Sequence, residues 1–258
     1  MALLLIKWTK DLINNKYTLP IGKAEFIKYT QEEFDNLKFY KYGLYKCKIT
    51  GDINPKLFYR NSNNIYTHLE LRIAKEQKYI ITIIDEDDNF MYYPKRIHNH
   101  ILFKQYVDLL FPHKKKCFLI KRLLNILWGG LCEKNKIIKK VDSKECSILK
   151  DDDLEFQPTI DNEGNIISFS IIEEKKLFKY DSCKISPFIT AYGRYEYYNL
   201  IKNHHELLIK THTDGFIINM TDGEVKKHFD MGKGIGQLKI EEEYKKLEII
   251  NNNSIKSI

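Results

Sequence analysis

The chain has 258 residues, of which 43% are hydrophobic and 30% are charged, and its formal net charge is +7. This composition is typical of a folded globular protein and excludes an intrinsically disordered chain. The length corresponds to one large domain or two small ones. The mild positive charge fits either a polyanionic partner such as nucleic acid or a solvated, lysine-rich surface.

The cysteine content and the N-terminus indicate the compartment. Five cysteines are present, and none stands in a C-x-x-C pair. This pattern argues against a disulfide framework or a zinc knuckle, and it indicates a reducing compartment such as the cytoplasm. The N-terminal stretch "MALLLIKW" is too short for a signal peptide, and no apolar run is long enough to span a bilayer. We therefore expect no membrane partner.

The first half of the chain predicts a strand, a helix and a second strand. Residues 39–49, "FYKYGLYKCKI", mix aromatic and apolar side chains, as strands do. Residues 65–77 predict a helix, because Thr67 and Glu70 have the spacing of a capping box at its start. Residues 78–85, "KYIITIID", predict a buried strand that ends at the acidic run "EDDN".

Two helices joined by a short basic loop follow. Residues 99–111 carry apolar side chains at helical spacing, with Asn99 as the expected N-cap and Pro112 as the stop. After the loop "HKKK", residues 117–128 predict a second helix, which the two following glycines are expected to end. Because the loop is short, the two helices must lie antiparallel.

The second half of the chain predicts a hairpin, a helix and a second hairpin. The hairpins cover residues 154–172 and 206–220, and the second one has Asp-Gly in its turn. The helix covers residues 186–204 and has Pro187 in its first turn. Because strands and helices do not alternate regularly, the sequence indicates an α+β fold and not a doubly wound α/β fold.

The turn of the second hairpin, "THTDGF", holds a carboxylate at its tip. Asp-Gly between apolar strands is a strong turn signal, so Asp214 could have a structural role alone. A carboxylate at a hairpin tip also projects clear of the sheet, and Mg²⁺ prefers one or two carboxylates together with substrate phosphates. Both interpretations stay open at this point.

The helix over residues 117–128 contains a second candidate group. Lys121, Asn125 and Trp128 follow one another at i, i+4 and i+7, so they share one face. A cation on that face could hold a triphosphate, and the glycines after it would let a nucleic-acid backbone approach closely. The alternative is a core helix whose lysine extends to the surface.

Taken in order, these segments resemble the family B DNA polymerases. Residues 121–129 fit the pattern K-x-x-x-N-x-x-aromatic-G and are similar to motif B of that family. Residues 211–216 are similar to motif C, with Asp214 in the position of its second aspartate. Residues 185–201 resemble the palm helix that precedes motif C, with Arg194 in the position of that helix's usual arginine.

The resemblance extends over roughly residues 100 to 245, since residues 234–241 resemble the segment that follows motif C. The chain departs from the family at Ile126, where the family has Ser, at His212, where it has the first aspartate of motif C, and at Gly215, where it has Ser. The "TDG" form and the compact fingers look most like the polymerases of viruses and selfish elements, including protein-primed ones.

The resemblance implies a DNA-directed DNA polymerase that binds primer–template DNA and dNTP, uses Mg²⁺ and works in the cytoplasm or at a viral replication site. It implies an antiparallel palm sheet with flanking helices and a two-helix fingers hairpin. Its expected domains are a region following motif A at 1–98, the fingers at 99–132 and the palm at 133–258. The implied site residues are Asp214 for catalysis and metal binding, Lys121, Asn125, Trp128 and Lys116 for nucleotide binding, and Gly129 and Arg194 for DNA binding.

Motif A, which supplies the other metal-binding aspartate in that family, has no clear counterpart. "DNFMYYP", starting at Asp88, keeps the aspartate and the Tyr-Pro, but we expect Asp88 to be an exposed turn residue. Residues 12–26 resemble the stretch just after motif A, so motif A and the exonuclease are expected upstream or on a second polypeptide. The alternatives are an inactive nucleic-acid-binding remnant, one subunit of a split polymerase, or an unrelated α+β protein.

Overall fold

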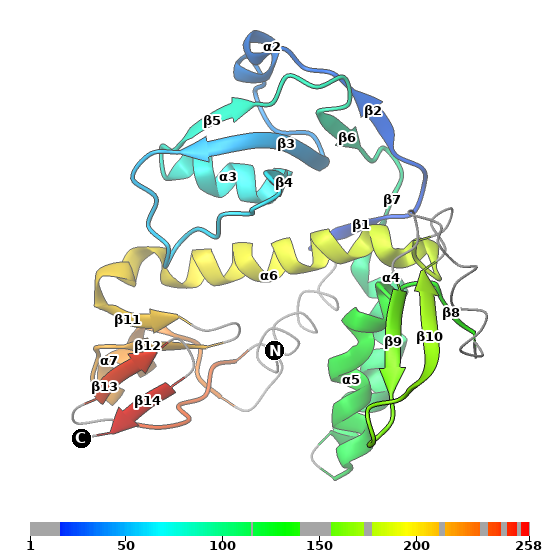
Figure 1. Ribbon diagram of the computed structural model, residues 1–258. Helices are drawn as coiled ribbons and strands as arrows, with labels where there is room; N and C mark the ends of the chain where they lie inside the picture. Colours follow the sequence, from blue (N-terminus) through cyan, green and yellow to red (C-terminus); the bar gives the residue numbers. More distant parts are fainter. Residues whose placement is uncertain are drawn as a thin grey trace.

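The computed structural model describes residues 16–114, 116–139, 156–172, 177–211, 215–232, 237–243, 247–251 and 254–257. The chain has the predicted α+β fold, and every pair of named strands in these ranges is antiparallel. Helix α6 (Ser186–Ile201) runs through the middle of the molecule (Figure 1). A sheet with helix α3 lies on one side of α6, and the α4–α5 hairpin and the C-terminal strands lie on the other.

The N-terminal sheet is built around strand β3 (Gly43–Thr50), where the sequence predicts a strand at 39–49. Along β3 buried side chains alternate with more exposed ones, because successive side chains point to opposite faces. Gly43 is needed at its start, since a Cβ there would lie 2.2 Å from the carbonyl oxygen of Met91. The other strands of this sheet are β2 (Glu25–Ile27), β6 (Phe90–Tyr92), β4 (Ile65–Thr67) and β5 (Ile80–Ile83), in the order β2-β6-β3-β4 with β5 also on β3.

Helix α3 (His68–Glu76) confirms the predicted helix and its capping box. The backbone N–H of Glu70 donates to Oγ1 of Thr67 at 3.4 Å, and the backbone N–H of Thr67 donates to Oε2 of Glu70 at 2.8 Å. These two bonds satisfy N–H groups that have no partner inside a helix. The first residues of the predicted range form strand β4, so the helix begins only after Thr67.

The prediction of a buried strand at 78–85 is only half right, because β5 lies at an edge of the sheet. Its outer edge is bonded by a side chain from helix α2 (Gln31–Asp35). Oε1 of Gln31 accepts from the backbone N–H of Ile83 at 2.8 Å, and its Nε2 donates to the carbonyl of Ile81 at 3.3 Å. The acidic run that follows is solvent-exposed, and Asp88 is an exposed turn residue, as predicted.

The predicted antiparallel helical hairpin consists of α4 (Asn99–Leu110), a short 3-10 turn η1 (Phe111–His113) and α5 (Phe118–Leu131). The hydroxyl of Tyr106 on α4 donates to the carbonyl of Leu123 on α5 at 2.9 Å. Two details of the prediction are wrong. Asn99 is the first helical residue and not the N-cap, which is His98. Helix α5 continues through Gly129 and Gly130, because neither glycine adopts the positive φ of a helix terminator.

Helix α6 contributes side chains to two neighbouring cores. Its C-terminal half places Tyr198 and Ile201 among the rings under the N-terminal sheet, together with Tyr45, Tyr66 and Phe90. Its N-terminal half packs into a second core that α4 and the N-terminal strand share. The members of this second core include Tyr17, Leu19, Leu69, Phe103, Val107, Phe188 and Tyr192. The expected segments 1–98 and 133–258 therefore share a hydrophobic core in space.

The remaining strands form small separate sheets. Both predicted hairpins are present, as β9 and β10 and as β11 and β12. The other described elements are β1 (Thr18–Pro20), β7 (Arg96–His98), β8 (Lys136–Lys139), β9 (Phe156–Ile160), β10 (Ile166–Ile172), η4 (Asp181–Ile185), η5 (Lys202–Leu207), β11 (Leu208–Thr211), β12 (Phe216–Ile218), α7 (Asp222–His228), β13 (Leu247–Asn251) and β14 (Ser254–Ser257). None of the helices described has both the length and the apolar character needed to cross a membrane.

Candidate nucleotide and nucleic-acid site

Positive charge is concentrated on the α4–α5 hairpin. Residues 99–132 contain six Lys and Arg residues and one Asp, which is a net charge of +5 out of +7 for the whole chain. We call the basic residues described between the two helices and in the first turns of α5 the basic elbow: Lys114, Lys116, Lys121 and Arg122. Two of the residues predicted to bind nucleotide, Lys121 and Lys116, belong to it, and both are exposed.

Two charges of the basic elbow, Lys114 and Lys121, are close enough to interact, and the described residues provide the elbow with no counterion. The pKa of Lys114 is lowered by partial burial and by the positive charge of Lys121. No member of the basic elbow forms an ion pair in the part of the chain that the structure describes. By contrast, Lys104 on α4 pairs with Asp108 one turn later. An unneutralised group of cations attracts an anion from outside.

The two glycines near the end of α5 leave an open patch of helix surface. A Cβ on Gly129 or Gly130 would meet no atom within 4 Å, and neither residue has a positive φ. The fold therefore gives no steric reason for glycine, although each one costs a helix about 1 kcal/mol relative to alanine. Asn125 and Trp128 lie between Lys121 and these glycines on α5, but their side chains are outside the described ones.

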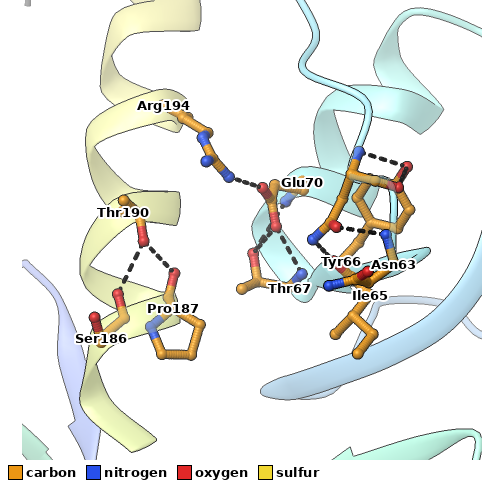
Figure 2. Close-up of polar contacts among 10 residues, drawn as sticks. Asn63, Ile65, Tyr66, Thr67, Glu70, Ser186, Pro187, Thr190 and Arg194 are labelled. Atoms are coloured by element: carbon orange, nitrogen blue, oxygen red, sulfur yellow. Dashed lines mark hydrogen bonds and ion pairs between the residues drawn. The ribbon is translucent and has the colours of Figure 1, made fainter. Parts of the chain in front are cut away.

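Arg194 on α6 contacts two other segments, and Figure 2 shows the first of these contacts, its bond to Glu70. Its Nη1 donates to Oε1 of Glu70 on α3 at 2.7 Å, and its Cζ lies 4.7 Å from the ring centroid of Tyr59. The Arg194 side chain is 41% exposed, whereas that of Glu70 is 8% exposed. One turn earlier on α6, the hydroxyl of Thr190 donates back to the carbonyl of Ser186 at 2.9 Å. The guanidinium is thus ordered and still accessible from solvent.

The structure does not bring all predicted site residues together. Arg194 lies on α6, and it contacts Glu70 and Tyr59 instead of the basic elbow. Asp214 lies outside the described residues, so its metal-binding role and its approach to Lys121 across one cleft stay predictions. In the ranges that are described, no group of three or more His, Cys, Asp or Glu side chains is placed to hold a metal ion.

Four residues of these clusters were not predicted as site residues: Lys114, Arg122, Glu70 and Tyr59. Lys114 is part of the "HKKK" run, whose positive charge was the available signal. Glu70 was predicted only as a helix cap, and its bond to Arg194 joins residues 124 positions apart. Tyr59 has no sequence signal, because its contact with Arg194 depends on how the loop before β4 packs on α6.

Comparison of the chain with protein-family models, with curated proteins and with solved structures gave no match. The resemblance to the polymerase family therefore rests only on the motifs of this chain and on the elements that contain them.

Proposed function

We propose that the chain is the fingers and palm part of a DNA-directed DNA polymerase similar to family B. The observation that carries this proposal is the basic elbow, whose cations have no ion-pair partner among the described residues and adjoin the open glycine patch of α5. The motif-B-like segment falls on a helix, the Arg194 segment falls on a long helix, and the strands of a hairpin flank Asp214. These are the element types that the three motifs require.

In the proposed reaction a primer 3′-hydroxyl attacks the α-phosphate of a dNTP. Lys121, with Lys116 as a second cation, neutralises charge on the triphosphate, since an ammonium acts as a point charge toward phosphate. Asn125 and Trp128 shape the nucleotide pocket. The patch at Gly129 lets the template strand approach the helix closely, and Arg194 binds the DNA backbone.

Magnesium chemistry of this kind uses two ions that stabilise the attacking and leaving oxygens. Asp214 would supply one carboxylate ligand, and the described residues hold no cluster that could complete the site. A complete site would need a further carboxylate from outside the described residues, in this chain or in a partner. The residues named in this proposal account for binding and orientation of nucleotide and DNA, and Asp214 accounts for one ligand of the metal site.

A second candidate function is nucleic-acid binding without catalysis, either as a remnant or as one subunit of a split polymerase. The observation in its favour is the surroundings of Asp88, the aspartate of the motif-A-like segment. Asp88 is exposed in a turn whose other carboxylates pair with lysines: Asp85 with Lys28 at 3.1 Å and Glu86 with Lys46 at 2.5 Å. A solvated acidic turn is a poor place for a buried metal ligand.

The nucleotide role of the basic elbow is tested by Lys121→Ala, with Lys104→Ala as the matched control. Lys104 is a lysine of the same hairpin, but it pairs with Asp108. Binding of dTTP with Mg²⁺ to the full chain on a primer–template duplex should weaken about tenfold in Lys121→Ala, because the variant cannot make the charge-assisted hydrogen bond to phosphate. Lys104→Ala should bind as the unchanged chain does. Equal affinities in all three proteins would refute the nucleotide role.

The metal role is tested by Asp214→Asn, since the amide is nearly isosteric and tolerates turns. Mg²⁺-dependent dTTP binding should be lost, in this chain or in its complex with a partner, while the melting temperature should change little. If the variant unfolds and the folded remainder keeps its metal response, Asp214 is only a turn residue.

A further inference from the structure

The carboxylate of Glu70 is fixed by three hydrogen bonds from two elements. Its Oε2 accepts from the backbone N–H of Thr67 at 2.8 Å and from the Thr67 hydroxyl at 3.1 Å. Its Oε1 accepts from Nη1 of Arg194 at 2.7 Å (Figure 2). Because Glu70 is nearly buried and is tied to the first turn of α3, its carboxylate has one orientation.

The guanidinium of Arg194 receives its orientation from this carboxylate and from a ring. Its planar group has five N–H donors, and the bond to Glu70 is the hydrogen bond it makes in the described part of the chain. Its Cζ lies over Tyr59, whose ring is largely exposed. The remaining donors are therefore ordered, partly exposed and free to bind an anion from outside.

Stability alone is a weak reason for the Glu70–Arg194 pair. Helices α3 and α6 are already linked by Nε2 of Gln77, which donates to the Tyr198 hydroxyl at 2.7 Å, and by the pair of Lys202 and Glu76 at 2.8 Å. An ion pair with a half-exposed arginine adds little to stability. The cap at Thr67 uses Oε2 of Glu70, whereas Arg194 uses Oε1. The main consequence of the pair is the fixed direction of the guanidinium.

We propose that Glu70 is a positioning residue that fixes the Arg194 guanidinium for one backbone phosphate of a nucleic-acid strand. The ring of Tyr59 also holds the guanidinium in place. This inference rests on the proposed function, in which Arg194 binds DNA. A planar guanidinium binds phosphate through paired N–H groups, so its affinity depends on orientation as well as on charge. A binding group is most effective when a second residue holds it in place.

The test is the affinity of the full chain for a fluorescent primer–template duplex with a single-stranded template overhang, measured by anisotropy. Glu70→Gln should weaken binding about fivefold, because contacting residues of one network are coupled. Loss of the negative charge of Glu70 would by itself strengthen DNA binding. A weaker affinity of Glu70→Gln therefore indicates positioning of Arg194, and a stronger affinity indicates simple electrostatics. Arg194→Lys keeps the charge but loses the planar fork, and it should weaken binding at least as much.

Glu76→Gln is the matched control, because it is the same substitution on the same helix, breaks the pair with Lys202 and leaves every bond of Glu70 in place. It should not weaken DNA binding, although it removes the same negative charge. In an Arg194→Ala background, Glu70→Gln should have no further effect on binding. Where Glu70→Gln does not fold, Tyr59→Leu decides instead, since Tyr59 is outside the core and its loss should also weaken binding.

The two possible failures are distinguishable. Unchanged or tighter binding by Glu70→Gln, together with weaker binding by Arg194→Lys, would overturn the positioning role and leave the proposed function in place. If Tyr59→Leu is the deciding variant, unchanged binding overturns the positioning role in the same way. If neither Arg194→Lys nor Lys121→Ala affects binding, the proposed function itself fails, and the positioning role fails with it.

Discussion

The N-terminal sheet and the α4–α5 hairpin differ in how far their charged side chains form ion pairs. In the sheet region lysines meet carboxylates of the same chain, as Lys28 does with Asp85 and Lys46 with Glu86. In the hairpin Lys104 has such a partner, whereas the basic elbow has none among the described residues. A charge that is paired within the chain is neutralised locally, whereas a cluster of unpaired charges can bind a ligand of opposite charge.

The two regions also treat their large apolar side chains differently. The sheet region has a cluster of buried rings, in which Phe90 stacks on Tyr45 at a centroid distance of 4.2 Å and is fully removed from solvent. The hairpin leaves Phe118, Leu109 and Ile126 exposed, and Phe118 is 77% exposed. Phe90 is therefore a core residue of the sheet region, while Phe118 lies on the surface of the hairpin.

The largest expected effect is the contrast between Phe90→Ala and Phe118→Ala, the same substitution in the two regions. Phe90→Ala should lower the free energy of unfolding by about 3–5 kcal/mol, because it opens a cavity among stacked rings. Phe118→Ala should change it by no more than about 0.5 kcal/mol, as an exposed substitution does. Urea unfolding followed by circular dichroism measures both values. A comparable loss in both variants would mean that the hairpin has a core of its own.

A second prediction concerns acid stability of the sheet region. Burial, and to a lesser extent the charge of Arg72, lowers the pKa of His68 to about 3. An unfolded histidine titrates near pH 6.5, so the unfolded chain gains a proton there that the folded chain does not. Stability should therefore be complete above about pH 6.5 and fall as the pH drops toward 3. At pH 5 the loss from this residue is about 2 kcal/mol.

Urea midpoints at pH 7 and pH 5 test this expectation in His68→Phe, which keeps a ring beside Tyr42, whose centroid lies 4.5 Å away. The variant should lose less stability on acidification than the unchanged chain. The exposed His113 of the hairpin provides the control, since His113→Gln should leave the pH profile unchanged. An identical acid response in His68→Phe would show that other groups control it.

The smallest expected effect is a change in salt dependence. Lys114→Gln removes one unpaired cation of the basic elbow, and Lys46→Gln removes one lysine that is paired with Glu86. For duplex DNA, removing one lysine that binds a phosphate should reduce the slope of log affinity against log salt by about 0.9. Affinity for a short duplex at several KCl concentrations should show this reduction for Lys114→Gln only. Equal slopes would mean that the hairpin charges do not contact DNA.

Local features of the fold could be predicted from the sequence. The capping box of Thr67 and Glu70 and the strands on either side of the Asp-Gly turn depend on residues a few positions apart, and both the cap and the paired strands β11 and β12 are present. The end of α5 was not predictable in the same way. Glycine ends a helix only when the chain adopts a positive φ, and Gly129 and Gly130 do not.

Long-range features could not be predicted. Strands β1 and β7 have three residues each, too few to show a period, and they pair across about 80 positions of the chain. In the candidate site, the positive charge of the elbow was readable from composition. The contact of Glu70 with Arg194 was not, because it arises only when α3 and α6 pack together.

The side-chain amide of Gln31 ends the N-terminal sheet at the outer edge of β5. An open strand edge is a template on which a strand of another molecule can add, and this is a common start of aggregation. Gln31 offers β5 one donor and one acceptor, which is what a neighbouring strand would offer at that point. A single side chain thus occupies the position that an incoming molecule would need, and the sheet is closed to further strands at β5.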